Sequence, residues 1–174
     1  MSDTVQRMKP ALLVIDIQNA YLNMMQDSHK DRAMDFIAGL ISYFEKNDFP
    51  IISVYHEDIK YGYGPKKGTE GFEFPKRITI AHENRVVKNY GDAFNKTNLN
   101  ELLRTKGCNT LFLCGLSATG CVLHTFVGAQ NNDFTAFLVK DALISDDHEH
   151  TKWIENIYNS IGWEALSTMI RYSC

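Results

Sequence analysis

Cys121 is the residue of this chain whose type and position best suit covalent chemistry. It follows residues 109–120, NTLFLCGLSATG, in which an apolar run predicts a buried strand and small residues predict a sharp turn. Apolar residues then recur at helical spacing over 122–129, so we expect Cys121 in the first turn of a helix. Unpaired N–H groups and the positive end of the helix dipole favour a thiolate there, and the thiolate is the nucleophilic form of cysteine.

A structural role for Cys121 is the alternative. Free cysteine is among the most frequently buried residue types, and a cysteine on an apolar helix commonly packs in a core. Two features favour chemistry instead: the turn consists of small residues, and the strand before it is of the buried, parallel type. In open α/β sheets, ligands bind at the carboxyl ends of such strands.

Two charged residues stand at the ends of other predicted strands. Asp16 lies near the end of the apolar run 11–17, ALLVIDI, and Lys88 follows the short apolar piece Val86 and Val87. A carboxylate beside hydrophobic residues is costly to bury unless it has a partner. Taken singly, an acid at a turn and a surface lysine would need no functional explanation. In a parallel sheet, however, Asp16, Lys88 and Cys121 would converge on one carboxyl edge.

The rest of the chain alternates between predicted helices and strands. We predict strands over 51–56, 134–139 and 166–170, the last of which is the final element, and helices over 31–47 and 98–106. Thr97 or Asn98 would cap the second of these helices. A further helix follows the strand 134–139 and would begin with a capping box of Asp146 and Glu149. Buried strands that alternate with helices favour a doubly wound sheet. The predicted fold class is α/β: a single three-layer α/β/α, Rossmann-like domain over 1–174 with a six-stranded, mainly parallel sheet.

Two further segments have alternative interpretations. Residues 57–76 form a long loop rich in glycine and aromatic residues, and such loops are usually functional or disordered. Its tyrosines and phenylalanines favour a pocket wall or lid. His148 and His150 flank Glu149, which suggests metal binding, but alternate residues on a helix point apart. We therefore expect these histidines to be solvated.

The composition excludes several classes of partner. The 174 residues carry a formal net charge of −3, so no cationic surplus exists to bind nucleic acid or an anionic membrane. No apolar stretch approaches the roughly 18 to 20 residues of a membrane span. The 4 cysteines, Cys108, Cys114, Cys121 and Cys174, show no CxxC pairing and no zinc spacing, so we expect no disulfide framework and a cytoplasmic location.

Three segments resemble the isochorismatase-like cysteine hydrolases, the superfamily of nicotinamidase and N-carbamoylsarcosine amidohydrolase. They are LLVIDIQNAYL, VVKNYGDAFNKTNLNELL and LFLCGLSATGCVLHT, and the likeness covers nearly the whole chain. The resemblance implies the isochorismatase-like fold and a catalytic triad that falls by motif on Asp16, Lys88 and Cys121. It implies that Cys121 attacks an amide or ureido carbonyl carbon, that Asp16 shuttles the proton, and that Lys88 positions both.

The resemblance also implies further parts of a site. A cis peptide between Leu116 and Ser117 would aim the backbone N–H of Ser117, with that of Cys121, at the tetrahedral oxyanion, and each such donor is worth about 2.7 to 4 kcal/mol. The expected substrate pocket consists of Gln18, Tyr21, His56, Tyr90, Phe94 and Leu116. Relatives commonly assemble, so we expect a homo-oligomer in which aromatic residues of the 57–76 loop complete a neighbour's site.

The chain also departs from its relatives. Nicotinamidases resemble one another in a metal site built on an Asp-x-His motif, and here His56 has no Asp two residues before it. We therefore expect no metal and no cofactor. Many relatives carry Thr, Asp and an aromatic residue where this chain has Ala118, Thr119 and Gly120, a difference that would widen the pocket.

The leading interpretation is a metal-independent cysteine amidohydrolase that cleaves a small amide, carbamoyl or ureido substrate through a thioester on Cys121. The alternatives are a thiol redox sensor or ligand-binding protein, a vinyl-ether hydrolase and an inactive scaffold. True isochorismatases lack the cysteine, which disfavours vinyl-ether hydrolysis. Asp16 and Lys88 favour the enzyme, because a sensor thiol needs no proton shuttle to a leaving group.

Overall fold

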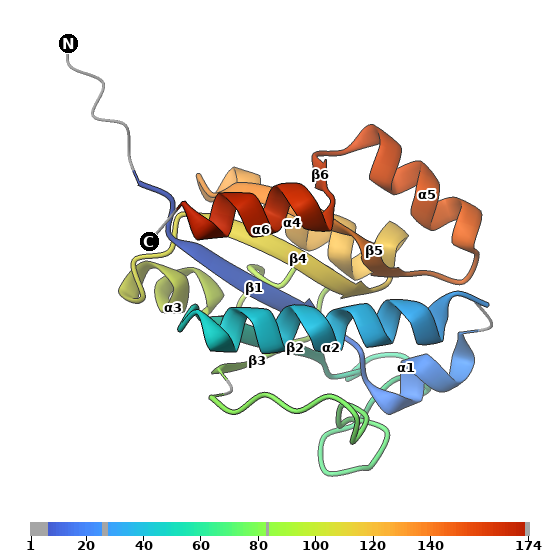
Figure 1. Cartoon of the computed structure of the whole chain (residues 1–174). Helices are drawn as coiled ribbons and strands as arrows, with labels where there is room; N and C mark the ends of the chain where they lie inside the picture. Colours follow the sequence, from blue (N-terminus) through green and yellow to red (C-terminus); the bar gives the residue numbers. More distant parts are fainter. Residues whose placement is uncertain (1–6, 26–27, 83, 173–174) are drawn as a thin grey trace.

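The computed structural model describes residues 7–25, 28–82 and 84–172 (Figure 1). Its sheet has six strands, all parallel, in the order β3-β2-β1-β4-β5-β6. The strands are β1 Pro10–Ile15, β2 Ile51–His56, β3 Asn84–Lys88, β4 Thr110–Leu116, β5 Thr135–Ile144 and β6 Ser160–Ile161. The predicted α/β class is therefore confirmed, and the sheet is parallel throughout.

Helices cover both faces of the sheet. They are α1 Asn19–Met24, α2 Lys30–Lys46, α3 Leu99–Thr105, the π-helical turn η1 Ala118–Val122, α4 Leu123–Asn131, α5 His148–Ile157 and α6 Trp163–Arg171. Helices α2 and α6 lie on one face, and α3 and α4 lie on the other (Figure 1). This arrangement is the predicted three-layer α/β/α fold.

The central strand β1 shows why the apolar runs form buried parallel strands. All of its residues are buried, and its side chains alternate between the two faces of the sheet. Leu13 and Ile15 join the core cluster that contains side chains of α3 and α4, whereas Leu12 and Val14 join the cluster that contains those of α2. A strand with a helix layer on each side needs apolar residues at every position, which is the pattern seen here.

The prediction of a final strand over 166–170 is wrong. These residues belong to α6, whose Leu166 and Ile170 are buried four residues apart on one face of the helix. The sixth strand is the two-residue β6, in which Ser160 pairs with Leu138 and Ile161 pairs with Val139 of β5. A spacing of four places both residues on one face of either a helix or a strand, but the exposed Thr168 between them does not fit the alternation of a strand.

The chain around α5 also differs from the prediction. Strand β5 continues to Ile144 instead of ending at Val139. The N-cap of α5 is Asp147 and not Asp146, because the Asp147 carboxylate accepts the N–H of Glu149 at 2.9 Å. His148 is half-buried and stacks on the ring of His29 with ring centroids 3.6 Å apart, so the prediction that it is solvated is wrong.

The 57–76 loop is anchored at one end and exposed at the other. Phe72 and Phe74 stack on Tyr55 of β2, with ring centroids 5.4 and 4.1 Å away. Tyr61 and Tyr63 have exposed fractions of 63% and 77%. The anchoring phenylalanines thus pack in the fold, and the tyrosines remain available to a second copy. The homo-oligomer stays a prediction, which light scattering can test.

Three of the four cysteines lie within the described residues. Cys108, Cys114 and Cys121 are free thiols, while Cys174 lies outside the described residues. None of the described helices combines the length and the apolar character that a membrane span requires.

Candidate active site

Four chemically reactive side chains come from the carboxyl ends of four neighbouring strands. Asp16 directly follows β1, His56 ends β2, Lys88 ends β3, and Cys121 lies in η1 just after β4. These strands are adjacent in the order β3-β2-β1-β4 and run in the same direction. All four residues therefore meet at one edge of the sheet, as we expected for Asp16, Lys88 and Cys121.

The backbone at this edge has unusual conformations. Asp16 has a φ of 53°, in the left-handed region that asparagine and aspartate tolerate better than most residues. Beside it, Gly115 has a φ of 119°, and an added Cβ at Gly115 would collide with the backbone of Ile15. Only glycine allows β4 to pass this close to the end of β1. The close approach helps to bring the turn that carries Cys121 toward Asp16.

A buried ion pair lies at the centre of the site. The Nζ of Lys88 donates to Oδ2 of Asp16 at 2.7 Å, and both side chains have an exposed fraction of 0%. Lys88 also donates to the carbonyl oxygen of Tyr90 at 3.1 Å. Burial acts to lower the pKa of Lys88, but the charges of Asp16 and Cys121 and the hydrogen bonds to them outweigh it, and the pKa is raised. Lys88 is therefore an ammonium at neutral pH.

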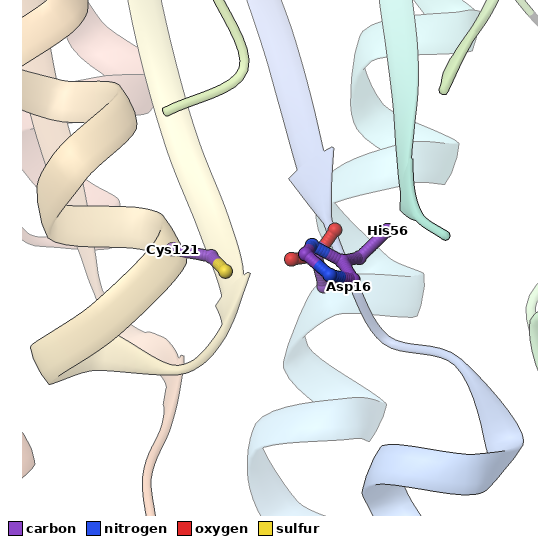
Figure 2. Close-up of side chains that lie close together, drawn as sticks. All are labelled: Asp16, His56 and Cys121. Carbon is purple, nitrogen blue, oxygen red and sulfur yellow. The ribbon is translucent and has the colours of Figure 1, made fainter. Parts of the chain in front are cut away.

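The second oxygen of Asp16 is available for chemistry. Oδ1 is buried and has no hydrogen-bond partner among the described residues. The site brings three atoms within 4.8 Å of one another: a carboxylate oxygen of Asp16, a ring nitrogen of His56 and the sulfur of Cys121. Figure 2 shows the Cys121 sulfur pointing toward Asp16 and His56. The carboxylate that lies near the thiol therefore has one oxygen without a partner among the described residues.

The charge state of Cys121 differs from the prediction. Burial, and then the negative charge of Asp16, raises the pKa of the Cys121 thiol to about 12, although the charge of Lys88 acts in the opposite direction. Cys121 also lies in η1, before the first residue of α4. The expected thiolate stabilised by a helix dipole is wrong, because burial and the carboxylate dominate. The resting group is a thiol that needs a base.

His56 contacts the other side of the ion pair. Its Nδ1 lies 3.3 Å from the Nζ of Lys88. Burial, and then the charge of Lys88, lowers the pKa of His56, against the opposing effects of Asp16, Asp58 and the Tyr90 carbonyl. His56 is therefore a neutral imidazole at physiological pH. Sequence reasoning placed His56 in the pocket and missed its contact with Lys88, although both residues end adjacent strands and pair in register.

Asp16, His56 and Cys121 also offer three metal-ligand atoms close together, the only such group found among the described residues. We tested whether they fit a metal ion. The Lys88 ammonium already lies 2.7 Å from Asp16 and 3.3 Å from His56. A divalent cation held by these groups would face a buried positive charge at close range. The donor set therefore does not fit a metal ion while Lys88 is charged.

The predicted pocket residues divide into two groups. Tyr21 is half-buried, and its ring centroid lies 6.0 Å from that of His56. The side chain of Tyr90 is 43% exposed, and its hydroxyl accepts a hydrogen bond from the Nζ of Lys96 at 3.1 Å. The ion pair is thus contacted at Lys88 by His56 and by the backbone of Tyr90, and Tyr21 lies next to His56.

The other three predicted pocket residues make contacts within the fold, and their place in a substrate pocket stays a prediction. Gln18 is fully buried, and its amide donates to the carbonyl oxygens of His56 and Phe72 and accepts the N–H of His56. These hydrogen bonds hold the end of β2 in position. Leu116 is 3% exposed and belongs to the core cluster on the α2 side, and Phe94 packs against Phe134 with ring centroids 5.8 Å apart.

The turn before Cys121 has the geometry that the resemblance implied. The peptide bond between Leu116 and Ser117 is cis. Ser117, whose N–H belongs to this peptide bond, is half-buried and stands at the start of the turn that carries Cys121.

Comparison with known proteins places this geometry in a family. The model of the isochorismatase domain matches residues 10–166. The chain belongs to the isochorismatase family. It is a hydrolase of that family, so the resemblance seen in the three sequence segments is confirmed.

Individual relatives include proteins with different activities. A maleamate amidohydrolase of Pseudomonas putida is 35% identical over 167 residues, which cover 81% of this chain and 76% of that protein. A probable inactive nicotinamidase of Arabidopsis thaliana is 27% identical over 172 residues, with 86% and 88% covered. The N-carbamoylsarcosine amidase of Thermoplasma acidophilum superposes with a TM-score of 0.77 at 26% identity, covering 89% of this chain and 95% of that one.

Proposed function

We propose that this protein is a cysteine hydrolase that cleaves the C–N bond of a small amide, carbamoyl or ureido substrate. The observation that supports it most directly is the different use of the two oxygens of Asp16. Oδ2 accepts a hydrogen bond from Lys88 at 2.7 Å, whereas the buried Oδ1 has no partner among the described residues. Lys88 thus fixes one oxygen, and we assign the other as the base for the Cys121 thiol, whose sulfur lies within 4.8 Å of a carboxylate oxygen of Asp16.

In the acylation half of the proposed reaction, Oδ1 of Asp16 takes the proton of the Cys121 thiol as the sulfur forms a bond to the carbonyl carbon. The carbonyl becomes an oxyanion that accepts hydrogen bonds from the backbone N–H groups of Ser117 and Cys121. Asp16 then gives its proton to the leaving nitrogen. The C–N bond breaks, an amine or ammonia departs, and a thioester remains on Cys121.

In the second half, Asp16 takes a proton from a water molecule whose oxygen attacks the thioester carbon. The C–S bond breaks, the acid is released, and the sulfur recovers the proton from Asp16. Lys88 forms no bond in this cycle. Its ammonium donates a hydrogen bond to Oδ2 of Asp16 at 2.7 Å and places an opposite charge beside the buried carboxyl group.

The relatives support the same class of reaction. The names of the maleamate amidohydrolase and the N-carbamoylsarcosine amidase both describe cleavage of C–N bonds. The redox-sensor alternative has less support, since reactive sensor thiols are exposed and have a low pKa, whereas burial raises the pKa of Cys121.

Ammonia release from a panel of primary amides, carbamoyl compounds and ureido compounds tests the proposal. We expect the wild-type protein to release ammonia from some of them and Cys121→Ala to release none. Cys108→Ala, which removes a different free thiol, is the matched control and should retain activity. The proposal is wrong if Cys121→Ala works at the wild-type rate, or if the wild type hydrolyses no member of the panel.

A further inference from the structure

A histidine side chain holds the carbonyl group of Gly120. The Nδ1 atom of His124, in the first turn of α4, lies 2.8 Å from this carbonyl oxygen. A carbonyl oxygen can only accept a hydrogen bond, so we assign a proton to Nδ1, which makes the ring the donor. The backbone N–H of Leu123 donates to the same oxygen. Two donors therefore hold the Gly120 carbonyl in one orientation.

This carbonyl belongs to the peptide bond that also contains the N–H of Cys121. Gly120 has a φ of −119° and a ψ of −109°, which is not helical although the residue lies inside η1. The carbonyl and the N–H of a trans peptide lie in one plane and point in opposite directions, so fixing the oxygen also fixes the N–H. A hydrogen bond to the oxygen polarises the peptide and strengthens its N–H as a donor.

The ring of His124 packs against the turn that follows Lys88. A Cβ added at Gly91 would lie 3.2 Å from the Cγ and Nδ1 atoms of the ring, so glycine leaves the room that the ring occupies. Lys88 donates to the carbonyl oxygen of Tyr90, the residue before Gly91, at 3.1 Å. His124 therefore joins the segment that carries Cys121 to the segment that carries Lys88.

Other contacts attach α4 to the same turn. The backbone N–H of Ala93 donates to Oγ1 of Thr125 at 3.1 Å. A Cβ added at Gly128 would collide with the carboxylate of Asp92, so the turn lies directly against the helix. Because these contacts do not involve His124, removing its ring should leave α4 in place.

We infer that His124 is a positioning residue, which orients the peptide between Gly120 and Cys121 so that the N–H of Cys121 meets the oxyanion. This inference rests on the proposed amide hydrolysis at Cys121. His124 acts through the backbone in this scheme, and its ring forms no bond to the substrate. Loss of the ring should therefore weaken only those reactions of Cys121 in which a carbonyl oxygen gains negative charge or becomes tetrahedral.

Two reactions of Cys121 test this inference. Amide hydrolysis passes through a tetrahedral oxyanion, whereas alkylation by iodoacetamide displaces iodide and forms no oxyanion. In His124→Leu, kcat for the panel amide that the wild type hydrolyses fastest should fall about tenfold, with KM changed less than about twofold. The alkylation rate of Cys121 should stay within about twofold of the wild-type rate, since the charges that shift its pKa are those of Asp16 and Lys88.

A rescue variant and a matched control accompany His124→Leu. Asn132 donates from its Nδ2 to the carbonyl oxygen of Gly128 at 2.8 Å, so an asparagine already spans the same four-residue spacing in this protein. His124→Asn should therefore recover most of the lost kcat. Gln130→Leu replaces another exposed polar side chain of α4 and should retain the wild-type kcat. A role of His124 in stability alone would not give this pattern.

Propionaldehyde tests the same N–H without turnover. Addition of the Cys121 thiol forms a C–S bond, and the thiol proton ends on the former carbonyl oxygen, which takes the place of the oxyanion. Protection of Cys121 from iodoacetamide measures the dissociation constant of this adduct. The constant should rise about tenfold in His124→Leu and return toward the wild-type value in His124→Asn.

The outcomes distinguish the inference from the proposed reaction. The inference is overturned if His124→Leu binds propionaldehyde as tightly as the wild type, if its alkylation rate falls as far as its kcat, if His124→Asn recovers nothing, or if the wild type does not bind propionaldehyde. Ammonia release by the wild type would then still support hydrolysis at Cys121. Conversely, weaker aldehyde binding in His124→Leu, with no amide hydrolysed by the wild type, would remove the proposed reaction and keep the role of His124.

Discussion

Two ion pairs of almost equal length show how differently this protein uses charge. Lys88 and Asp16 approach to 2.7 Å with side chains that are 0% exposed. Arg77 and Asp31 approach to 2.8 Å with side chains that are 42% and 80% exposed. Water therefore hydrates the second pair and is excluded from the first.

The energetic consequences are opposite. An exposed pair gains little, typically about 0 to 1 kcal/mol, because water and salt screen it. A buried pair loses the hydration of both charges, and removing one partner leaves an uncompensated buried charge that costs about 3 to 5 kcal/mol. Burial of Asp16 and Lys88 is thus weak evidence for added stability. Its consequence is that the carboxyl group near Cys121 is paired with Lys88 and shielded from water.

The largest expected effect of a change to the buried pair is on turnover. Asp16→Asn removes the proposed base, so kcat should fall by a factor on the order of 10² to 10⁴. The same change removes a negative charge that raises the pKa of Cys121, while Lys88 remains to stabilise the thiolate. Alkylation of Cys121 by iodoacetamide should therefore begin at lower pH than in the wild type, in which the pKa is about 12.

Peptide mass spectrometry after alkylation separates Cys121 from Cys108 and Cys114. Loss of turnover together with faster alkylation is the expected combination. Unchanged turnover in Asp16→Asn would rule out Asp16 as the proton carrier, and slower alkylation would contradict the electrostatic role given to its charge.

Removal of the buried lysine should have the second largest effect, and this effect is on the free energy of unfolding. Lys88→Met keeps most of the side-chain volume but leaves Asp16 buried without its counter-ion. The free energy of unfolding in urea should fall by about 3 to 5 kcal/mol. In the double variant Lys88→Met/Asp16→Asn, position 16 carries a neutral amide, so part of the lost free energy of unfolding should be recovered. Equal destabilisation in the single and double variants would show that packing, and not charge, determines the loss.

The smallest effect should come from the exposed pair. Arg77→Gln breaks the contacts of Arg77 with Asp31 at 2.8 Å and with Asp35 at 3.6 Å. The free energy of unfolding should change by less than about 1 kcal/mol, and high salt should reduce the difference further. Urea titrations at low and high salt measure both quantities. If Arg77→Gln lowered the free energy of unfolding as much as Lys88→Met, the proposed difference between the buried and the exposed ion pair would be wrong.

Local patterns in the sequence were sufficient for much of the fold and for part of the site. Continuous apolar runs identified β1, β2 and β4, because strands covered on both faces need apolar residues throughout. Asp16 and Lys88 stood out as charges at the ends of such runs, and motif resemblance joined them to Cys121. The error at 166–170 arose because this five-residue window has apolar residues at both ends and fits both a strand and a helix, and the packing of Leu166 and Ile170 shows that it belongs to α6.

The tertiary structure decided what depends on contacts between distant segments. The thiol state of Cys121 follows from burial and from Asp16, which lies more than a hundred residues earlier in the chain. The neutral form of His56 follows from Lys88 on the neighbouring strand. The sequence by itself located β1, β2, β3 and β4, near whose ends the site residues lie, because those strands depend on local apolar patterns. Charge states depend on distance and on the exclusion of water, and these exist only once the strands lie side by side.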